Sequence, residues 1–223
     1  MSSLRVVMIG GTGAVGGHAI RTLLSMPALD RLTLLGRREV EGLGDPRVTQ
    51  HVVDVLDATT YRTHLDGHDA ALSTLGVGEP SKVSRERFVQ IDRDAPLAFG
   101  QACREAGVTR FGSLGSVGSS PTSASFFLRC KGELEAGLEA LEFAQLSLFR
   151  PSMILTPTNR YGVSQAITLA VWPHLQPLLL GGLRRYRGIR VEDLGAAMAK
   201  QLLQPARGTE RLEWDAIDAL ASS

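Results

Sequence analysis

Short apolar runs alternate along the chain with longer stretches in which apolar residues recur at helical spacing. The short runs predict six strands: Arg5–Ile9, Leu32–Leu35, Val48–Val53, Ala70–Leu75, Arg110–Leu114 and Leu146–Phe149. The longer stretches predict four helices: Val15–Ser25, Phe88–Ala106, Ser125–Leu141 and Glu192–Leu203. This alternation is typical of parallel βαβ units. It therefore predicts an α/β fold with a Rossmann-like, doubly wound parallel sheet.

The 223 residues contain no internal repeat, linker or low-complexity tract that would mark a domain boundary. We therefore predict a single NAD(P)-binding domain over residues 1–223. The alternation breaks between Ser152 and Arg190, which we interpret as an inserted, small C-terminal substrate lobe. The loosely apolar stretch Ala166–Leu183 is interrupted by prolines, a histidine and paired glycines, so we do not expect a membrane-spanning helix.

The composition excludes several classes of partner. The 24 Lys+Arg against 23 Asp+Glu give a net charge of +1, which argues against nucleic-acid binding. Cys103 and Cys130 form no disulfide framework, and the five histidines lack metal-ligand spacing. The run before Gly10 is too short for a secretory signal. We therefore expect a cytoplasmic protein with a small-molecule substrate and no metal site. Its oligomeric state is left open, a homodimer included.

A glycine-rich loop is the strongest chemical motif in the sequence. The first strand runs into the pattern G-x-x-G-x-x-G, which leads directly into a helix. Glycines at these places permit a sharp turn, approach of the backbone to a pyrophosphate, and close packing of helix on sheet. A glycine-rich turn without a ligand is the alternative, but the strand before and the helix after it argue against that reading. The residues predicted to bind a dinucleotide here are Gly10, Thr12, Gly13, Ala14, Val15 and Gly16.

The end of the second strand indicates which dinucleotide binds. An NAD-binding unit usually places a carboxylate there to hold the ribose 2′-hydroxyl, but this chain has Gly36, followed by Arg37 and Arg38. Two guanidinium groups suit a 2′-phosphate because they form bidentate, charge-assisted hydrogen bonds. We therefore predict NADP(H) as the cofactor. The alternative is that both arginines lie in a solvated loop.

The ends of the next two strands add weaker candidates. Asp54 is placed to accept a hydrogen bond from the adenine amino group, and Val55 to pack on the ring; a helix cap or surface acid is the alternative for Asp54. Leu75 and Gly76 follow the fourth strand and are expected to pass beneath a cofactor ribose. Ligands of such sheets lie outside the carboxyl ends of the strands, where all these residues fall.

Together these motifs resemble the atypical branch of the short-chain dehydrogenase/reductase superfamily, and most of all the Tat-interacting-protein-like NADPH-binding oxidoreductases. The matching stretches are Gly10–Gly16, Leu35–Arg38, Gly67–Asp69, Asp92–Asp94, Lys131–Ala136 and Phe149–Pro151. The resemblance runs from about Arg5 to Pro151. It implies a Rossmann fold, NADP(H) binding with a contribution from Pro151, and an oxidoreductase activity.

The resemblance also implies a catalytic serine, tyrosine and lysine. Ser116 matches the serine, with Ser113 and Ser119 as nearby alternatives, and Lys131 matches the lysine that also bonds the nicotinamide ribose. The tyrosine position, four residues before the lysine, is Phe127, which has no proton to give to a carbonyl oxygen.

Two hypotheses about function follow from this substitution. In the first, the protein is an NADPH-dependent oxidoreductase for a small carbonyl or enone, with Ser116 orienting the substrate and a water replacing the tyrosine as acid. In the second, it is a non-catalytic NADPH-binding regulatory or scaffold protein. Sugar-nucleotide epimerisation is disfavoured, because the chain lacks the long C-terminal substrate domain which that class needs.

Two further features receive structural interpretations. Asp92 and Asp94 flank Arg93 near a helix start, and we interpret them as a solvated capping cluster. Residues 184–190 contain four arginines, which either hold an anionic group or form a solvated loop. The nearby aromatic residues, which either line a pocket or belong to the core, are Tyr161, Trp172 and Tyr186.

Overall fold

The computed structural model describes residues 3–156 and 179–223. Its strands are β1 (Leu4–Ile9), β2 (Leu29–Gly36), β3 (Val48–Val52), β4 (Ala70–Ser73), β5 (Arg110–Leu114), β6 (Gln145–Phe149), β7 (Met153–Leu155), β8 (Gly188–Arg190) and β9 (Gly208–Leu212). Its α-helices are α1 (Ala14–Ser25), α2 (Arg85–Val89), α3 (Ala95–Glu105), α4 (Phe126–Glu139), α6 (Val191–Gln201) and α7 (Trp214–Ser222).

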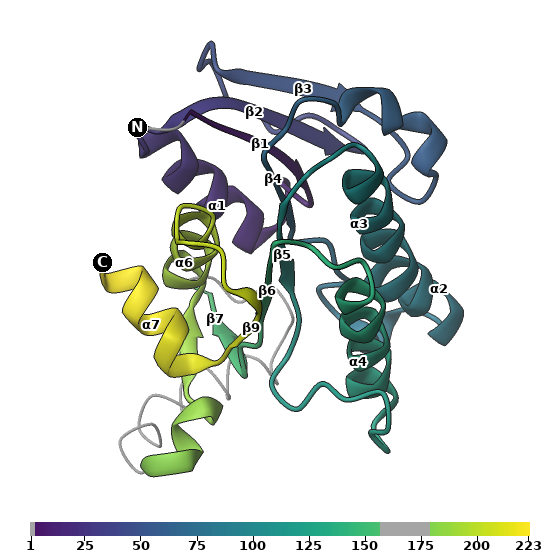
Figure 1. Cartoon of the computed structure of the whole chain (residues 1–223). Helices are drawn as coiled ribbons and strands as arrows, with labels where there is room; N and C mark the ends of the chain where they lie inside the picture. The colour runs from purple at the N-terminus through teal and green to yellow at the C-terminus, as the bar shows by residue number, and fades with distance from the viewer. Residues whose placement is uncertain (1–2, 157–178) are drawn as a thin grey trace.

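The main sheet has seven parallel strands in the order β3-β2-β1-β4-β5-β6-β9. The helices α1 and α6 cover one face of this sheet, and α3 and α4 cover the other (Figure 1). Chain order reverses between β1 and β4, which is the point where doubly wound sheets bind their ligands. The predicted Rossmann-like fold is therefore confirmed.

All six predicted strands and all four predicted helices are present, with shifted ends. For example, β2 begins earlier than predicted, at Leu29, and β4 ends earlier, at Ser73. The strands β7, β8 and β9 and the helix α7 were not predicted. In β9 the sequence Gly-Thr-Glu-Arg-Leu is mostly exposed at the edge of the sheet, so it lacks the apolar run that identified the other strands.

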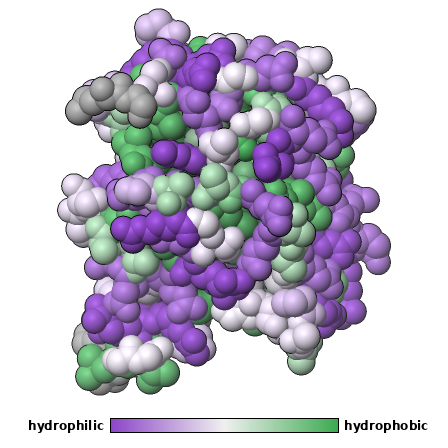
Figure 2. All heavy atoms as spheres, viewed as in Figure 1, coloured by the Kyte–Doolittle hydropathy of each residue, from purple (hydrophilic) through white to green (hydrophobic). Residues whose placement is uncertain are grey.

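Burial on both faces explains why the central strands read as continuous apolar runs. In β1, Val6 and Met8 contact the core layer under α1 and α6, whereas Val7 and Ile9 contact the layer under α3 and α4. Successive side chains of a strand point to opposite faces, so both sets must be apolar when both faces are covered. Figure 2 shows that apolar side chains on the viewed outer surface form small patches among hydrophilic ones.

The predicted helix Phe88–Ala106 consists of three segments. The short helix α2 is followed by one turn of π-helix (Gln90–Asp94) and then by α3. Pro96 stands in the first turn of α3 and has no N–H to donate to the preceding turn. The missing donor accounts for the irregular turn, and π-turns of this kind are frequent at functional sites.

The inserted segment between Ser152 and Arg190 is described only at its ends. There β7 pairs in parallel with β8 as a separate two-stranded sheet. The predictions for Tyr161 and Trp172 fall on residues 157–178, outside the described part of the chain. Among the described helices, none has the length and apolar character needed to cross a membrane.

Candidate functional site

The glycine loop has the tight packing that its sequence predicts. Gly10 has φ +84°, a conformation that favours glycine, and a Cβ there would lie 2.6 Å from the backbone carbon of Thr74. A Cβ on Gly16 would lie 2.3 Å from the carbonyl oxygen of Gly10. Gly13 caps α1, so the free N–H groups of the first helical turn follow directly, at Ala14 and Val15. This geometry suits an anion at the helix N-terminus.

Thr74 connects the glycine loop to the loop after β4 by two hydrogen bonds. Its hydroxyl donates to the carbonyl oxygen of Gly10 at 3.0 Å. Its backbone N–H donates to the carbonyl oxygen of Ile9 at 3.1 Å, which extends the pairing of β1 with β4 beyond the last strand residue. The two loops thus form one surface at the carboxyl end of the sheet.

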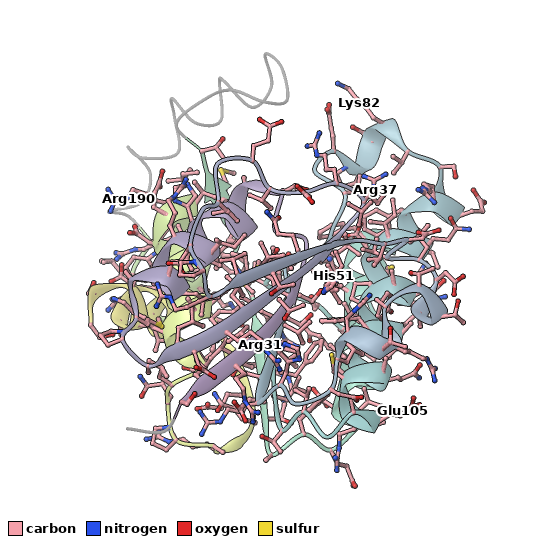
Figure 3. All side chains as sticks on the ribbon, turned by 90° about the horizontal axis from the view of Figure 1, so that it is seen from above. Arg31, Arg37, His51, Lys82, Glu105 and Arg190 are labelled. Carbon is pink, nitrogen blue, oxygen red and sulfur yellow. The ribbon has the colours of Figure 1, made fainter. Side chains whose placement is uncertain are left out.

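A cavity of about 390 Å³ opens beside this surface. Its lining comes from the glycine loop and from the ends of the neighbouring strands: Gly10, Gly11, Thr12, Leu34, Leu35, Gly36, Arg37, Arg38, Val40, Gln50, His51, Val55 and Leu75. Figure 3 shows Arg37 toward the same end of the molecule as Lys82, and Arg31 and Glu105 toward the opposite end. The structure therefore brings the glycine loop and both predicted arginines to one cavity.

Of the two residues predicted to contact the adenine, Val55 lines this cavity and Asp54 does not. Val55 is buried and lines it, as expected of a residue that packs on an adenine ring. Asp54 is exposed and is absent from the lining, and its carboxylate accepts the backbone N–H of Leu56 at 3.0 Å. Asp54 is thus a surface acid that stabilises a turn, as the alternative interpretation holds, whereas the cap of the following short helix is Asp57.

Sequence reasoning missed a pair of stacked histidines, of which His51 lines the cavity. The rings of His51 and His64 stack with their centroids 3.7 Å apart and their planes 11° from parallel. Partial burial, and then the charge of His64, lower the pKa of His51. Their spacing in the sequence gives no sign of this contact, because the pair forms where β3 and a short helix at 62–64 meet in space. In the described part of the chain, no three His, Cys, Asp or Glu side chains are arranged to hold a metal.

Lys131 and Asp92 form a buried ion pair below the loop after β4. The Lys131 Nζ lies 2.8 Å from Asp92 Oδ1, and the exposed fractions of the two side chains are 6% and 3%. The other carboxylate oxygen of Asp92 accepts the backbone N–H of Val77 at 2.8 Å. A Cβ on Gly76 would lie 3.1 Å from Asp92 Oδ1, so this glycine allows the loop to pass close over the pair.

The interpretation of Asp92 as part of a solvated cluster was wrong. The π-turn points its side chain inward against Lys131, a partner too distant in sequence for local reasoning to find. Only Arg93 and Asp94 remain near the surface. Arg93 donates to Asp94 at 2.8 Å and to Glu133 at 2.7 Å, which joins the π-turn to α4 on its outer side.

Phe127 lies one helical turn before Lys131, on the same face of α4. Its ring packs against Phe88 with the centroids 5.6 Å apart, and Phe88 in turn lies one turn before Asp92. Residues four apart on a helix share a face. The Phe88–Phe127 contact and the Lys131–Asp92 pair therefore lie one turn apart, and both join α4 to the segment formed by α2 and the π-turn. The residue that replaces tyrosine is therefore placed next to the lysine, as the Y-x-x-x-K spacing requires.

Ser116 is the most accessible of the three candidate serines. It is half-buried in the loop after β5, and the contact of its hydroxyl is with the carbonyl oxygen of Val117 at 3.4 Å. Ser113 is buried inside β5, and the hydroxyl of Ser119 donates to the carbonyl oxygen of Ser116 at 2.7 Å. Pro151 accepts the backbone N–H of Val117 at 3.0 Å, so the loops after β5 and β6 lie side by side.

Two stretches that carry the family resemblance meet below this serine loop. The Nε of Arg150 donates to both carboxylate oxygens of Glu135 at 3.1 Å, and the Glu135 side chain is almost fully buried. Burial raises the pKa of Glu135, although Arg150 opposes the shift. A Cβ on Gly115 would lie 2.7 Å from the Glu135 carboxylate, so the pair supports the loop from beneath.

The arginines of residues 184–190 contact other side chains of the protein. The guanidinium groups of Arg184 and Arg187 lie 5.3 and 4.9 Å from the ring centroid of Trp214, and Arg184 also pairs with Asp215 at 2.7 Å. Arg190 pairs with Asp193 at 2.7 Å. The contacts with Trp214 and Asp215 attach the short helix at 181–186 and the residue after it to α7. Arg184, Arg185 and Arg190 are nevertheless exposed, so these contacts lie at the surface and both interpretations, an anion site or a solvated loop, stay open.

Comparison with known proteins shows the family to which the chain belongs. Residues 10–148 match the family model described as NAD(P)H-binding. The rat protein HTATIP2 is 32% identical over 157 residues, which cover 70% of this chain and 64% of the rat protein. The mitochondrial protein fmp52 of Emericella nidulans is 29% identical over 154 residues, or 67% of this chain and 66% of that protein. The chain thus matches slightly less than two thirds of the length of these relatives.

Solved structures show the same fold at low sequence identity. MoeE5 in complex with UDP-glucuronic acid and NAD superposes with a TM-score of 0.71 at 17% identity, covering 93% of this chain and 75% of that one. The Bordetella bronchiseptica enzyme WbmH in complex with NAD+ superposes with a TM-score of 0.69 at 18% identity, covering 98% and 79%. The fungal relative is named mitochondrial, so the cytoplasmic location stays a prediction. The chain belongs to the NAD(P)H-binding family, as an atypical short-chain dehydrogenase/reductase-like protein related to HTATIP2 and fmp52.

Proposed function

We propose that this protein binds NADP(H) and acts as an NADPH-dependent oxidoreductase on a small carbonyl or enone. The observation that carries the proposal is the cavity in which the glycine loop and the two arginines after β2 come together. Arg37 and Arg38 line the cavity where a carboxylate would otherwise select NAD(H). In the described chain, neither arginine forms an ion pair with a carboxylate, so both are available to a phosphate.

The remaining residues fit the other parts of such a cofactor. The N–H groups at the start of α1, at Ala14 and Val15, would receive the pyrophosphate, and Val55 would pack on the adenine. Leu75 and Gly76 would lie below the nicotinamide ribose, with Lys131 beneath them. Bound NADPH supplies a hydride. Ser116 would donate a hydrogen bond to the substrate carbonyl, and a water would deliver the proton.

Phe127 favours a second candidate function, a non-catalytic NADPH-binding regulatory or scaffold protein. A phenyl ring cannot protonate a carbonyl oxygen, and losing a general acid typically lowers the rate by about 10²–10⁴. The charge of Lys131 is also balanced by Asp92 at 2.8 Å. Cofactor binding does not need the missing hydroxyl, so the binding site remains intact under either function.

NADPH is expected to bind about tenfold more tightly than NADH, because two guanidinium groups can pair with the 2′-phosphate. Fluorescence titration of the two cofactors measures the ratio. Arg37→Ala should reduce this preference by weakening NADPH binding while leaving NADH binding nearly unchanged. Arg207→Ala, which removes an exposed arginine outside the cavity, is the matched control. Equal affinities of the wild-type protein for both cofactors would contradict NADP(H) specificity.

A further inference from the structure

A second cavity, of about 270 Å³, lies at the start of α4, on the side that carries Phe127. It is enclosed by α2, the start of α4 and the loop before α2. Its lining residues are Pro80, Ser81, Val83, Arg85, Phe88, Phe126 and Phe127. It shares no lining residue with the cofactor cavity. Its volume is near the lower end of the range for small-molecule sites.

Three phenylalanine rings give this cavity an apolar, aromatic wall. The Phe88 ring lies 5.8 Å from Phe126 and 5.6 Å from Phe127, tilted against both. Phe88 is almost fully buried, whereas Phe126 and Phe127 are half-buried and so leave part of their rings accessible. Aromatic side chains arranged in this way favour a planar ligand, which can pack against a ring face or edge.

The rim of the cavity carries a positive charge. The guanidinium of Arg85 lies 5.1 Å from the centroid of Phe126, and the residue is exposed. Among the described residues, no carboxylate forms an ion pair with Arg85. The nearby Lys82 already pairs with Glu79 at 2.8 Å. The adjacent Glu86 carboxylate is hydrogen-bonded by its own backbone N–H and by Ser84, and the charge of Arg85 adds a smaller attraction to it. Arg85 therefore remains available to an anion from solution.

A further arginine near the rim, Arg129, already donates a hydrogen bond to the backbone. Arg129 lies 6.0 Å from the Phe126 ring centroid and donates to the carbonyl oxygen of Ser123 at 2.8 Å. It adds positive potential near the same ring but is already hydrogen-bonded. Arg85 is thus the side chain that can pair with a ligand.

This cavity adjoins the reacting end of the proposed cofactor site. Phe127 lines it, and one turn further along α4 is Lys131, which lies below the Gly76–Val77 loop. Figure 3 shows Lys82, whose sequence neighbours line the cavity, toward the same end of the molecule as Arg37. The aromatic cavity and the cofactor cavity are therefore on the same end of the sheet.

We propose that this cavity binds a planar aromatic or conjugated molecule bearing one negative charge, with the rings against the phenylalanines and the anionic group at Arg85. The assignment of this molecule as substrate rests on the proposed oxidoreductase function, because its carbonyl would then face the cofactor beside Phe127. Binding itself needs only the rings and the arginine. The chemical class is thus an aryl carboxylate or sulfonate that also carries a carbonyl group.

Calorimetric titration of the full chain, without cofactor, with 2-naphthoate and with 2-naphthalenemethanol tests the pocket. The two probes share a ring system and differ in charge. We expect the carboxylate to bind at least about fivefold more tightly, because a charge-assisted hydrogen bond to Arg85 adds to the ring contacts. Arg85→Gln should remove this difference. Arg87→Gln, which changes an arginine of the same helix outside the cavity lining, should preserve it.

The outcomes distinguish ligand binding in this cavity from the proposed NADPH-dependent reduction. Equal binding of the two probes, or equal effects of the two arginine variants, would overturn the proposed anion site. Undiminished binding of both probes to Phe126→Leu would place them outside the aromatic cavity and reject it as well. Carboxylate binding without any oxidation of NADPH by aryl keto acids would support the pocket and contradict the reductase. Cofactor affinity is measured separately, by the NADPH titration.

Discussion

Phe127→Tyr is expected to raise NADPH-dependent carbonyl reduction by about 10²-fold or more. The substitution adds one hydroxyl to a ring already placed one helical turn before Lys131 and in contact with Phe88. The nearby Lys131 ammonium favours the phenolate and so lowers the tyrosine pKa, although the Asp92 carboxylate 2.8 Å from Nζ offsets part of this effect. The measurement is the rate of NADPH consumption with a panel of small aldehydes and quinones.

Phe126→Tyr is the matched control for this experiment. It introduces the same hydroxyl on the adjacent residue, whose partner one turn later is Cys130 rather than Lys131. A gain in the Phe127 variant alone would show that the acid is the missing part, and that the wild-type protein is a dormant enzyme or a pure binder. Substantial wild-type turnover that neither change affects would mean that Ser116 or a water already donates the proton. No turnover in any of the three proteins would favour the regulatory function.

Asp92→Ala is expected to lower the free energy of unfolding by about 3–5 kcal/mol, because it leaves a buried ammonium without its counter-ion. The substitution also removes the acceptor for the backbone N–H of Val77. Urea unfolding measures the change. A combined Asp92→Leu and Lys131→Met variant should recover most of the loss, since an apolar pair of similar size needs no charge compensation.

Arg93→Ala provides the comparison at the surface. It breaks the contacts with Asp94 and Glu133, which are partly solvent-exposed, and should cost no more than about 1 kcal/mol. If Asp92→Ala were no more destabilising than this control, the burial of the Lys131–Asp92 pair would be contradicted. If the double variant unfolded as easily as Asp92→Ala, the loss would come from packing rather than from the unpaired charge.

The parts of the fold that sequence predicted are those with a strong local signal. The strand β1 and the helix α1 combine an apolar run, a glycine turn and a helical period, and both are confirmed to within one residue. The edge strand β9 was missed because only its last residue is buried, so its alternation carries little hydrophobic contrast. Its pairing with β6 is a property of the assembled sheet.

In the candidate site, too, sequence predicted the residues with a local signal and missed those whose partners are distant in the chain. The glycine loop and Arg37 could be assigned from position, because the end of a parallel strand places a residue at a known edge of the sheet. Asp92 could not, because its burial depends on a π-turn that aims it at Lys131 on another helix. The stacked histidines and the Glu135–Arg150 pair have the same origin, since each joins residues distant in sequence.

The contact between Gly10 and Thr74 has a thermodynamic consequence for ligand binding. The loops after β1 and β4 touch so closely that a side chain at Gly10 would clash with Thr74, and the threonine hydroxyl donates a hydrogen bond to the Gly10 carbonyl oxygen. The two loops must therefore shift together or remain still. A dinucleotide that binds here contacts loops that are already ordered. The conformational entropy lost on binding is then that of the ligand rather than that of the loop backbone.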